Sequence, residues 1–147
     1  MTQVSILFVC LGNICRSPTA EAIFLKILER EHASARFTVD SAGLLGYHQG
    51  ELPDSRMRYH AGKRGYSLTH RSRPFSQADF DRFDMIVGMD DQNIAGLKQL
   101  AMTQEEEGLL KNISGRPEET QRILPIVLSS LGNQTYQVQL LREVDKI

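Results

Sequence analysis

Several features that define large classes of proteins are missing from this chain of 147 residues. The formal net charge is -1, so no global basic field indicates nucleic acid or a membrane surface as a partner. No stretch approaches the roughly 20 apolar residues that span a bilayer. The apolar run from Val4 to Leu11 lacks the basic flank of a signal peptide. These absences predict a cytoplasmic protein that binds neither nucleic acid nor membrane.

Cysteine is also scarce, because Cys10 and Cys15 are the only two in the chain. A disulfide between them would close a very short loop and restrict the unfolded chain little. Two cysteines alone cannot complete a zinc site, and we expect His48, His60 and His70 to be surface or structural residues rather than ligands. Close cysteines beside glycine in a reducing compartment are more often reactive than structural.

Strand patterns recur along the chain. Short runs rich in apolar and branched residues predict buried strands at 4–9, 36–41 and 84–89, with a weaker pattern at 123–128. These runs alternate with helical patterns, which predicts the α/β class with a parallel sheet covered by helices on both faces. We expect one domain over the whole chain. Ligands of such sheets collect at the carboxyl ends of the strands, which is where Cys10 falls.

Capping residues mark the expected helix starts. Ser17 is placed to cap the first helix, a second helix is expected to start near Asp54, and Asp90 or Asp91 is expected to cap a third. Helical spacing returns at 136–147. The third helix is expected to bury Ile94, Leu97 and Leu100.

The turn between the first strand and the first helix, with the sequence CLGNICRS, has the composition of a phosphate-binding loop. A bound dianion needs several converging N–H donors, and a loop leading into a helix amino terminus supplies them. Gly12 permits a backbone turn with positive φ, and Asn13 tolerates one better than most residues. Arg16 adds a planar fork that can hold two phosphate oxygens.

The same loop favours ionisation of Cys10, because donors that hold an anion also hold the negative charge of sulfur. Thiolate is the form that attacks phosphorus. We expect Ser17 to donate a hydrogen bond to this sulfur. A cysteine that ends a buried strand is usually a small hydrophobe. The Gly-Asn turn and the Arg-Ser-Pro helix start favour the nucleophile over that plainer interpretation.

Residues 9–21 (VCLGNICRSPTAE) resemble the signature of the low-molecular-weight protein tyrosine phosphatases. Further matches are DSAG at 40–43, YHQG at 47–50 and DMIVGMD at 84–90, so the resemblance covers roughly the first two-thirds of the chain. Residues after about 101 depart from the family pattern. The resemblance implies a small doubly wound fold with a four-stranded parallel sheet. It also implies hydrolysis of phosphotyrosine in proteins through a cysteinyl-phosphate intermediate, without metal or cofactor.

The resemblance assigns roles to individual residues. Cys10 and Arg16 are implied to be catalytic, as nucleophile and phosphate clamp, and Ser41 is implied to brace the loop together with Asn13. Cys15 matches a cysteine that can trap the nucleophile as a disulfide. The substrate-binding residues are expected to be Leu11, Gly12, Asn13, Ile14, Cys15, Ser17 and Tyr47, the last as an aromatic wall or only as a half-buried loop residue. A partner such as a bacterial autophosphorylating tyrosine kinase is suggested by the resemblance alone.

The late Asp-Pro segment that carries the family's general acid is absent. Glu118 and Glu119 are the carboxylates nearest the expected region, since the only aspartate after Asp91 is Asp145. One hypothesis is an active phosphatase with an unusual acid; another is a phosphotyrosine-binding module, because loss of a general acid costs about 10²–10⁴-fold in rate. A third is a frameshifted tail, since codons for residues 121–127 can spell Glu-Asp-Pro-Ser-Tyr-Ser in another frame.

An arsenate reductase is a further alternative, because such enzymes of similar fold share this loop. They relay oxidation through additional cysteines distant in sequence. The chain has no cysteine beyond Cys10 and Cys15, which disfavours that role.

Overall fold

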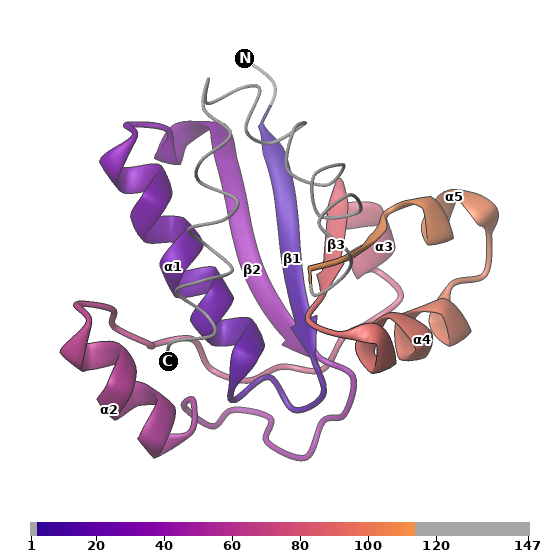
Figure 1. Ribbon diagram of the computed structural model, residues 1–147. Helices are drawn as coiled ribbons and strands as arrows, with labels where there is room; N and C mark the ends of the chain where they lie inside the picture. Colours follow the sequence, from indigo (N-terminus) through magenta and orange to yellow (C-terminus); the bar gives the residue numbers. More distant parts are fainter. Residues whose placement is uncertain (1–2, 114–147) are drawn as a thin grey trace.

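The computed structural model describes residues 3–113 and contains one sheet of four parallel strands (Figure 1). The order across the sheet is β2-β1-β3-β4, so β1 is central and the chain winds outward from it in both directions. The strands are β1 (Val4–Cys10), β2 (Phe37–Gly43), β3 (Met85–Gly88) and β4 (Leu110–Asn112). The predicted α/β fold with a doubly wound parallel sheet is therefore confirmed.

Helices cover both faces of this sheet. The longest, α1, lies against one face with α2 beyond it, and α3 and α4 lie on the opposite side (Figure 1). The helices are α1 (Arg16–Arg30), the single 3₁₀ turn η1 (Ser34–Arg36), α2 (Ser55–Lys63), α3 (Asp79–Arg82), α4 (Asp91–Leu100) and α5 (Gln104–Gly108). Within residues 3–113, none of these helices combines the length and apolarity needed to cross a bilayer.

The side chains of β1 alternate between two hydrophobic cores, as expected for a strand covered on both faces. Phe8 packs toward α1, where its ring meets Phe24 edge to face at 5.9 Å between centroids. Leu7 and Val9 point to the other side, toward α3 and α4, and both are fully buried. This double burial explains why the strand is apolar at every position from Ile6 to Cys10 rather than alternating.

Strand register brings the candidate nucleophile to the edge where the loops converge. Cys10 pairs with Gly43 at the last position of both β1 and β2, and Val9 pairs with Gly88 at the end of β3. The carboxyl ends of three neighbouring strands therefore meet beside the β1–α1 turn. Ligands of parallel α/β sheets bind at this edge.

The start of α1 differs from the sequence-based expectation. The helix begins at Arg16, with Cys15 in the cap position and no side chain capping it, so Ser17 lies inside the first turn. The hydroxyl of Ser17 is engaged by the loop instead. Positive φ falls on Asn13 (57°) and not on Gly12. The side-chain amide group of Asn13 is held in place by four hydrogen bonds, which are described below.

The starts of α2 and α4 follow the prediction. Asp54 accepts the first amides of α2, and Asp90 accepts an amide of α4 from Asn93. In α4, Leu97 is fully buried as expected, but Leu100 is 38% exposed, so its predicted burial is wrong. The helix ends at Leu100 and its last turn faces outward.

The end of the described chain was not predicted. Strand β4 contains only one apolar residue, Leu110, so it lacks the pattern that identifies a buried strand. Its place at the sheet edge is set by pairing with β3. The strand pattern at 123–128 and the helical pattern at 136–147 lie outside the described residues.

Candidate active site

The carbonyl groups of the β1–α1 loop point outward and are held by surrounding segments. The carbonyl of Cys10 accepts from the Leu44 amide at 3.0 Å, and that of Leu11 accepts from the Leu45 amide at 2.9 Å. The Ser72 hydroxyl donates to the Gly12 carbonyl at 3.0 Å. Each contact fixes the orientation of one peptide plane of the loop.

These outward carbonyls determine where the loop amides point, because N–H and C=O lie on opposite sides of a trans peptide plane. The amides that follow Cys10, Leu11 and Gly12 therefore face the inside of the loop. The carbonyl of Ile14 accepts from the Asp54 amide at 2.8 Å, which turns the Cys15 amide inward in the same way. A ring of inward N–H donors is the arrangement that holds a tetrahedral oxyanion.

The sulfur of Cys10 lies at the base of this ring and is contacted by two groups that can donate to it. The Ser17 hydroxyl is 3.0 Å from Sγ, and the backbone N–H of Asn13 donates to Sγ at 3.3 Å. The Ser17 oxygen already accepts a hydrogen from the Asn13 side chain at 2.8 Å. Its own hydrogen is therefore free to point at the sulfur, where it stabilises a thiolate.

The side chain of Asn13 is buried and all its hydrogen-bonding capacity is used. Its amide nitrogen donates to Ser17 and to Ser41, the latter at 3.0 Å. Its carbonyl oxygen accepts from the ring of His70 at 2.9 Å and from the Arg73 amide at 3.0 Å. The expected bracing role of Asn13 and Ser41 is confirmed, and two partners from residues 70–73 are added.

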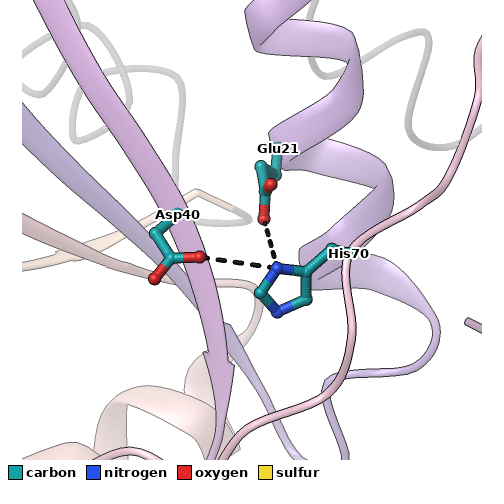
Figure 2. Close-up of side chains that lie close together, drawn as sticks. All are labelled: Glu21, Asp40 and His70. Atoms are coloured by element: carbon teal, nitrogen blue, oxygen red, sulfur yellow. Dashed lines mark ion pairs between the residues drawn. The ribbon is translucent and has the colours of Figure 1, made fainter. Parts of the chain in front are cut away.

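Behind Asn13 lies a half-buried group of charged side chains, from α1, β2 and the segment after α2 (Figure 2). The Ser41 hydroxyl donates to Glu21 at 2.6 Å. Burial, with a smaller contribution from Asp40, raises the pKa of Glu21 to about 7 against the opposing hydrogen bond from Ser41. Burial also lowers the pKa of His70, although Asp40 acts in the opposite direction.

Arg73 ties this group to the rest of the fold. It contacts Asp40 at 3.0 Å and forms a two-pronged contact with the fully buried Asp79 at 3.0 and 3.1 Å. Burial alone would lower the pKa of Arg73, but the hydrogen bonds and charges of Asp79 and Asp40 raise it overall. The guanidinium therefore stays charged and holds the segment that supplies His70 against the loop.

The predicted site residues occupy one edge of the sheet. Cys10, Asn13 and Ser17 are buried, Arg16 is half-buried at the first position of α1, and Leu11 is 56% exposed at the rim. Gly12, Ile14 and Cys15 are half-buried along the loop. Cys15 is a free thiol whose pKa is raised by burial first and then by Asp54 and Cys10. Tyr47 is 82% exposed, so the expectation of a half-buried loop aromatic does not hold.

Sequence reasoning missed three residues that support the loop. Glu21, His70 and Arg73 reach Asn13 or Ser41 through the contacts above. Glu21 stands inside the quoted motif, so its spacing from Cys10 was a usable signal. His70 lies 57 positions from Asn13, and only the fold brings them together.

A strand, a glycine-containing loop with inward amides and a helix amino terminus around a buried sulfur define a phosphate-loop protein of the α/β class. Residues 5–120 match the family model described as low molecular weight phosphotyrosine protein phosphatase. The chain belongs to this family.

Known relatives agree with this assignment. The low molecular weight phosphotyrosine protein phosphatase of Saccharomyces cerevisiae is 41% identical over 99 residues, which are 67% of this chain and 62% of the relative. The human protein of the same name is 43% identical over 95 residues, 65% of this chain and 60% of the relative. The aligned part of the chain thus spans about three-fifths of these relatives' length.

Solved structures match over more of the chain. A protein tyrosine phosphatase from Entamoeba histolytica superimposes with a TM-score of 0.75 at 32% identity and covers 98% of this chain and 89% of its own. A Drosophila structure described as an arginine phosphatase has a TM-score of 0.72 at 29% identity and covers 96% and 93%.

Proposed function

We propose that the protein hydrolyses phosphotyrosine in protein substrates through a cysteinyl-phosphate intermediate. The observation that carries the proposal is the sulfur of Cys10 at the base of a loop whose amides face inward, with the Ser17 hydroxyl 3.0 Å away. Family membership supports the reaction class. The loop would hold the three non-bridging phosphate oxygens, with the Arg16 guanidinium as a second clamp.

In the first step, the thiolate of Cys10 attacks phosphorus opposite the tyrosine oxygen, an S–P bond forms and the P–O bond to the phenol breaks. The loop amides and Arg16 stabilise charge on the equatorial oxygens. The leaving phenolate takes a proton from a general acid. In the second step, water attacks the phosphocysteine, gives up its proton to the same group and releases inorganic phosphate and the thiolate.

The contribution of a general acid to this reaction is measured with a series of leaving groups. Glu118 and Glu119, the carboxylates nearest the family's acid in sequence, lie outside the described residues. Phenol leaving groups of low pKa need little protonation. A substrate series with increasingly acidic phenols therefore measures how much acid catalysis the chain supplies: a steep dependence of kcat on the leaving group indicates that the acid is missing.

The remaining roles are proposed on the same basis. Leu11 to Cys15 supply backbone donors, and Tyr47 offers an exposed ring beside which the phenol of the substrate can stack. Cys15 would form a reversible disulfide with Cys10 under oxidation. We further propose that the chain acts as one domain in the cytoplasm on a phosphotyrosine protein, such as a bacterial tyrosine kinase.

The proposal is tested with the full chain, a nitrophenyl phosphate and a phosphotyrosine peptide. Wild type should hydrolyse both substrates and Cys10→Ser should hydrolyse neither. Calorimetry should still detect phosphate binding to the variant. A quenched reaction of wild type should yield protein heavier by one phosphoryl group. Equal rates for wild type and Cys10→Ser would exclude the nucleophile.

Two alternatives predict different results in the same experiment. A phosphotyrosine-binding module would bind the peptide with no turnover above that of Cys10→Ser. An arsenate reductase would consume a thiol reductant when arsenate is added, but the chain has only Cys10 and Cys15 for such a relay. Neither alternative is favoured by the comparisons.

A further inference from the structure

Positive charge is concentrated in α2 and the segment that follows it. Residues 55–71 contain five of the 17 arginines and lysines of the chain and none of its 18 aspartates and glutamates. The rest of the chain is therefore acidic, because the formal net charge of the whole is -1. A local excess of one sign attracts groups of the opposite charge, here carboxylates or phosphates.

One side of α2 faces the core and another faces solvent. Ala61 is fully buried and Met57 packs against the core. The helical spacing i, i+3, i+4 and i+7 brings four exposed side chains together on a different side of the helix, and these form the α2 stripe: Arg56, Tyr59, His60 and Lys63. The Lys63 ammonium lies 4.4 Å from the centre of the Tyr59 ring, and the His60 ring meets the same ring edge to face. The stripe thus presents cations around an exposed aromatic ring.

The first member of the α2 stripe lies beside the phosphate loop. Asp54, the residue before α2, donates its amide to the Ile14 carbonyl at 2.8 Å, and its carboxylate accepts the amides of Arg56 and Met57. The guanidinium of Arg56, whose side chain is 87% exposed, is 3.7 Å from this carboxylate. The pKa of Cys15 is raised mainly by burial and by Asp54, whereas Arg56 acts in the opposite direction, so this cation is within electrostatic reach of the loop. The position of the stripe relative to the loop is therefore fixed.

The length of the α2 stripe limits which partner it fits. From Arg56 to Lys63 the helix rises by about 10 Å, which about three residues of an extended chain cover. Residues within about five positions of a phosphotyrosine held in the loop therefore reach the stripe. A longer polyanion, such as a nucleic acid or an anionic membrane, would also meet the acidic remainder of the chain, which repels it. The stripe is thus best matched by carboxylates of the same molecule that carries the phosphate ester.

We propose that the α2 stripe binds acidic residues that flank the phosphotyrosine of a protein substrate. The role of the stripe depends on the proposed function, because it concerns the substrate of the same site. Arg56 holds a carboxylate through two parallel hydrogen bonds, Lys63 offers a compact charge, and the ring of Tyr59 covers the aliphatic part of a glutamate. Such contacts are made equally in the bound substrate and in the transition state. They should therefore lower KM and leave kcat unchanged.

The test compares two phosphotyrosine peptides on the full chain. One peptide carries glutamates on both sides of the phosphotyrosine, and the other carries glutamines at the same positions. An exposed ion pair contributes up to about 5-fold in affinity, so two pairs should give the acidic peptide a kcat/KM about 10-fold higher at low salt, through KM alone. The ratio between the peptides should fall towards one in about 1 M salt, where screening acts over about 3 Å.

Variants locate the contact. Arg56→Gln combined with Lys63→Gln removes two exposed charges from the stripe and should reduce the preference for the acidic peptide to about twofold or less. The matched control combines Arg30→Gln with Lys98→Gln, which removes two exposed charges elsewhere and should keep the preference. Arg30 ends α1, about 21 Å along the helix from Arg16, and Lys98 lies in α4 on the other side of the sheet.

Calorimetry of the same peptides with Cys10→Ser separates the role of the stripe from the proposed function. If wild type hydrolyses neither peptide, the proposed function fails, yet tighter binding of the acidic peptide to Cys10→Ser that is lost with Arg56→Gln and Lys63→Gln still supports the stripe. The proposal is overturned if the peptides bind equally or not at all, if the stripe variant retains the preference, or if the control variant loses it. Vesicles of phosphatidylserine that bind through the stripe, without any peptide preference, would also overturn it in favour of a membrane surface.

Discussion

Gly43 is the position where one added methyl group should disturb the phosphate loop most directly. A Cβ at this residue would lie 3.0 Å from the amide nitrogen of Asn13, the carbonyl carbon of Gly12 and the carbonyl oxygen of Leu11. All three neighbours are backbone atoms, so no side chain can rotate away. Gly43 is itself fixed, since its amide donates to the Arg73 carbonyl at 2.9 Å.

Relief of this contact requires the loop and the end of β2 to separate by a few tenths of an ångström. Overpacking of this kind costs about 1–3 kcal/mol. We therefore expect Gly43→Ala to lower the free energy of unfolding by that amount. The displaced backbone carries the Asn13 amide that contacts Cys10, so kcat/KM for a nitrophenyl phosphate should also fall, by about 10-fold or more.

The matched control is Gly62→Ala, within α2. A Cβ there has no neighbour within 4 Å, and alanine favours the helix, so stability should rise by up to about 1 kcal/mol with unchanged kinetics. Urea unfolding and steady-state kinetics measure both variants. If Gly43→Ala unfolds at the wild-type urea concentration and hydrolyses at the wild-type rate, the close approach of β2 to the loop does not define the loop geometry.

Three further predictions concern single side chains. Ser17→Ala removes the hydroxyl 3.0 Å from the sulfur and should lower kcat about 10–100-fold, the worth of a hydrogen bond to a charged group, with KM little changed; an unchanged kcat would remove Ser17 from the reaction. Phe24→Ala empties the space between Phe8 and Phe37 and should cost about 3–5 kcal/mol in chemical unfolding, and a loss below 1 kcal/mol would show that this core is not tightly packed. Glu21 has its pKa raised from 4.5 to about 7, so its contribution to stability is fully present below pH 4.5 and is lost as pH rises through 7. The free energy of unfolding of Glu21→Gln should therefore rise by about 3 kcal/mol relative to that of wild type between pH 4.5 and pH 7. A stability difference between the two proteins that stays constant over this pH range would contradict the raised pKa.

The fold was largely predictable because its signals are local. The apolar run of β1 and the aspartates that cap α2 and α4 each depend on a few neighbouring residues. The start of α1 was misplaced for a physical reason. Ser17 has the identity of a capping residue, but its hydroxyl is used by the sulfur of Cys10 and by Asn13.

The residues of the loop itself could be predicted from the sequence, but the residues that support the loop from behind could not. The order of residues from Cys10 to Ser17 is enough to indicate a phosphate loop. The support by His70 and Arg73 depends on how the segment after α2 returns across the end of β2, and no local pattern encodes that path. The exposure of Tyr47 likewise depends on what packs around its loop.

The outward bonding of the loop carbonyls has a consequence for protein engineering. The segment from Cys10 to Ser17 is shaped by donors that arrive from three later stretches of chain, at 44–45, at 54 and at 70–73. A synthetic peptide with the sequence of 9–21 would carry every residue of the motif but would lack the donors that orient its backbone amides toward one point. Transplanting phosphate recognition to another scaffold therefore means transplanting those distant donors as well.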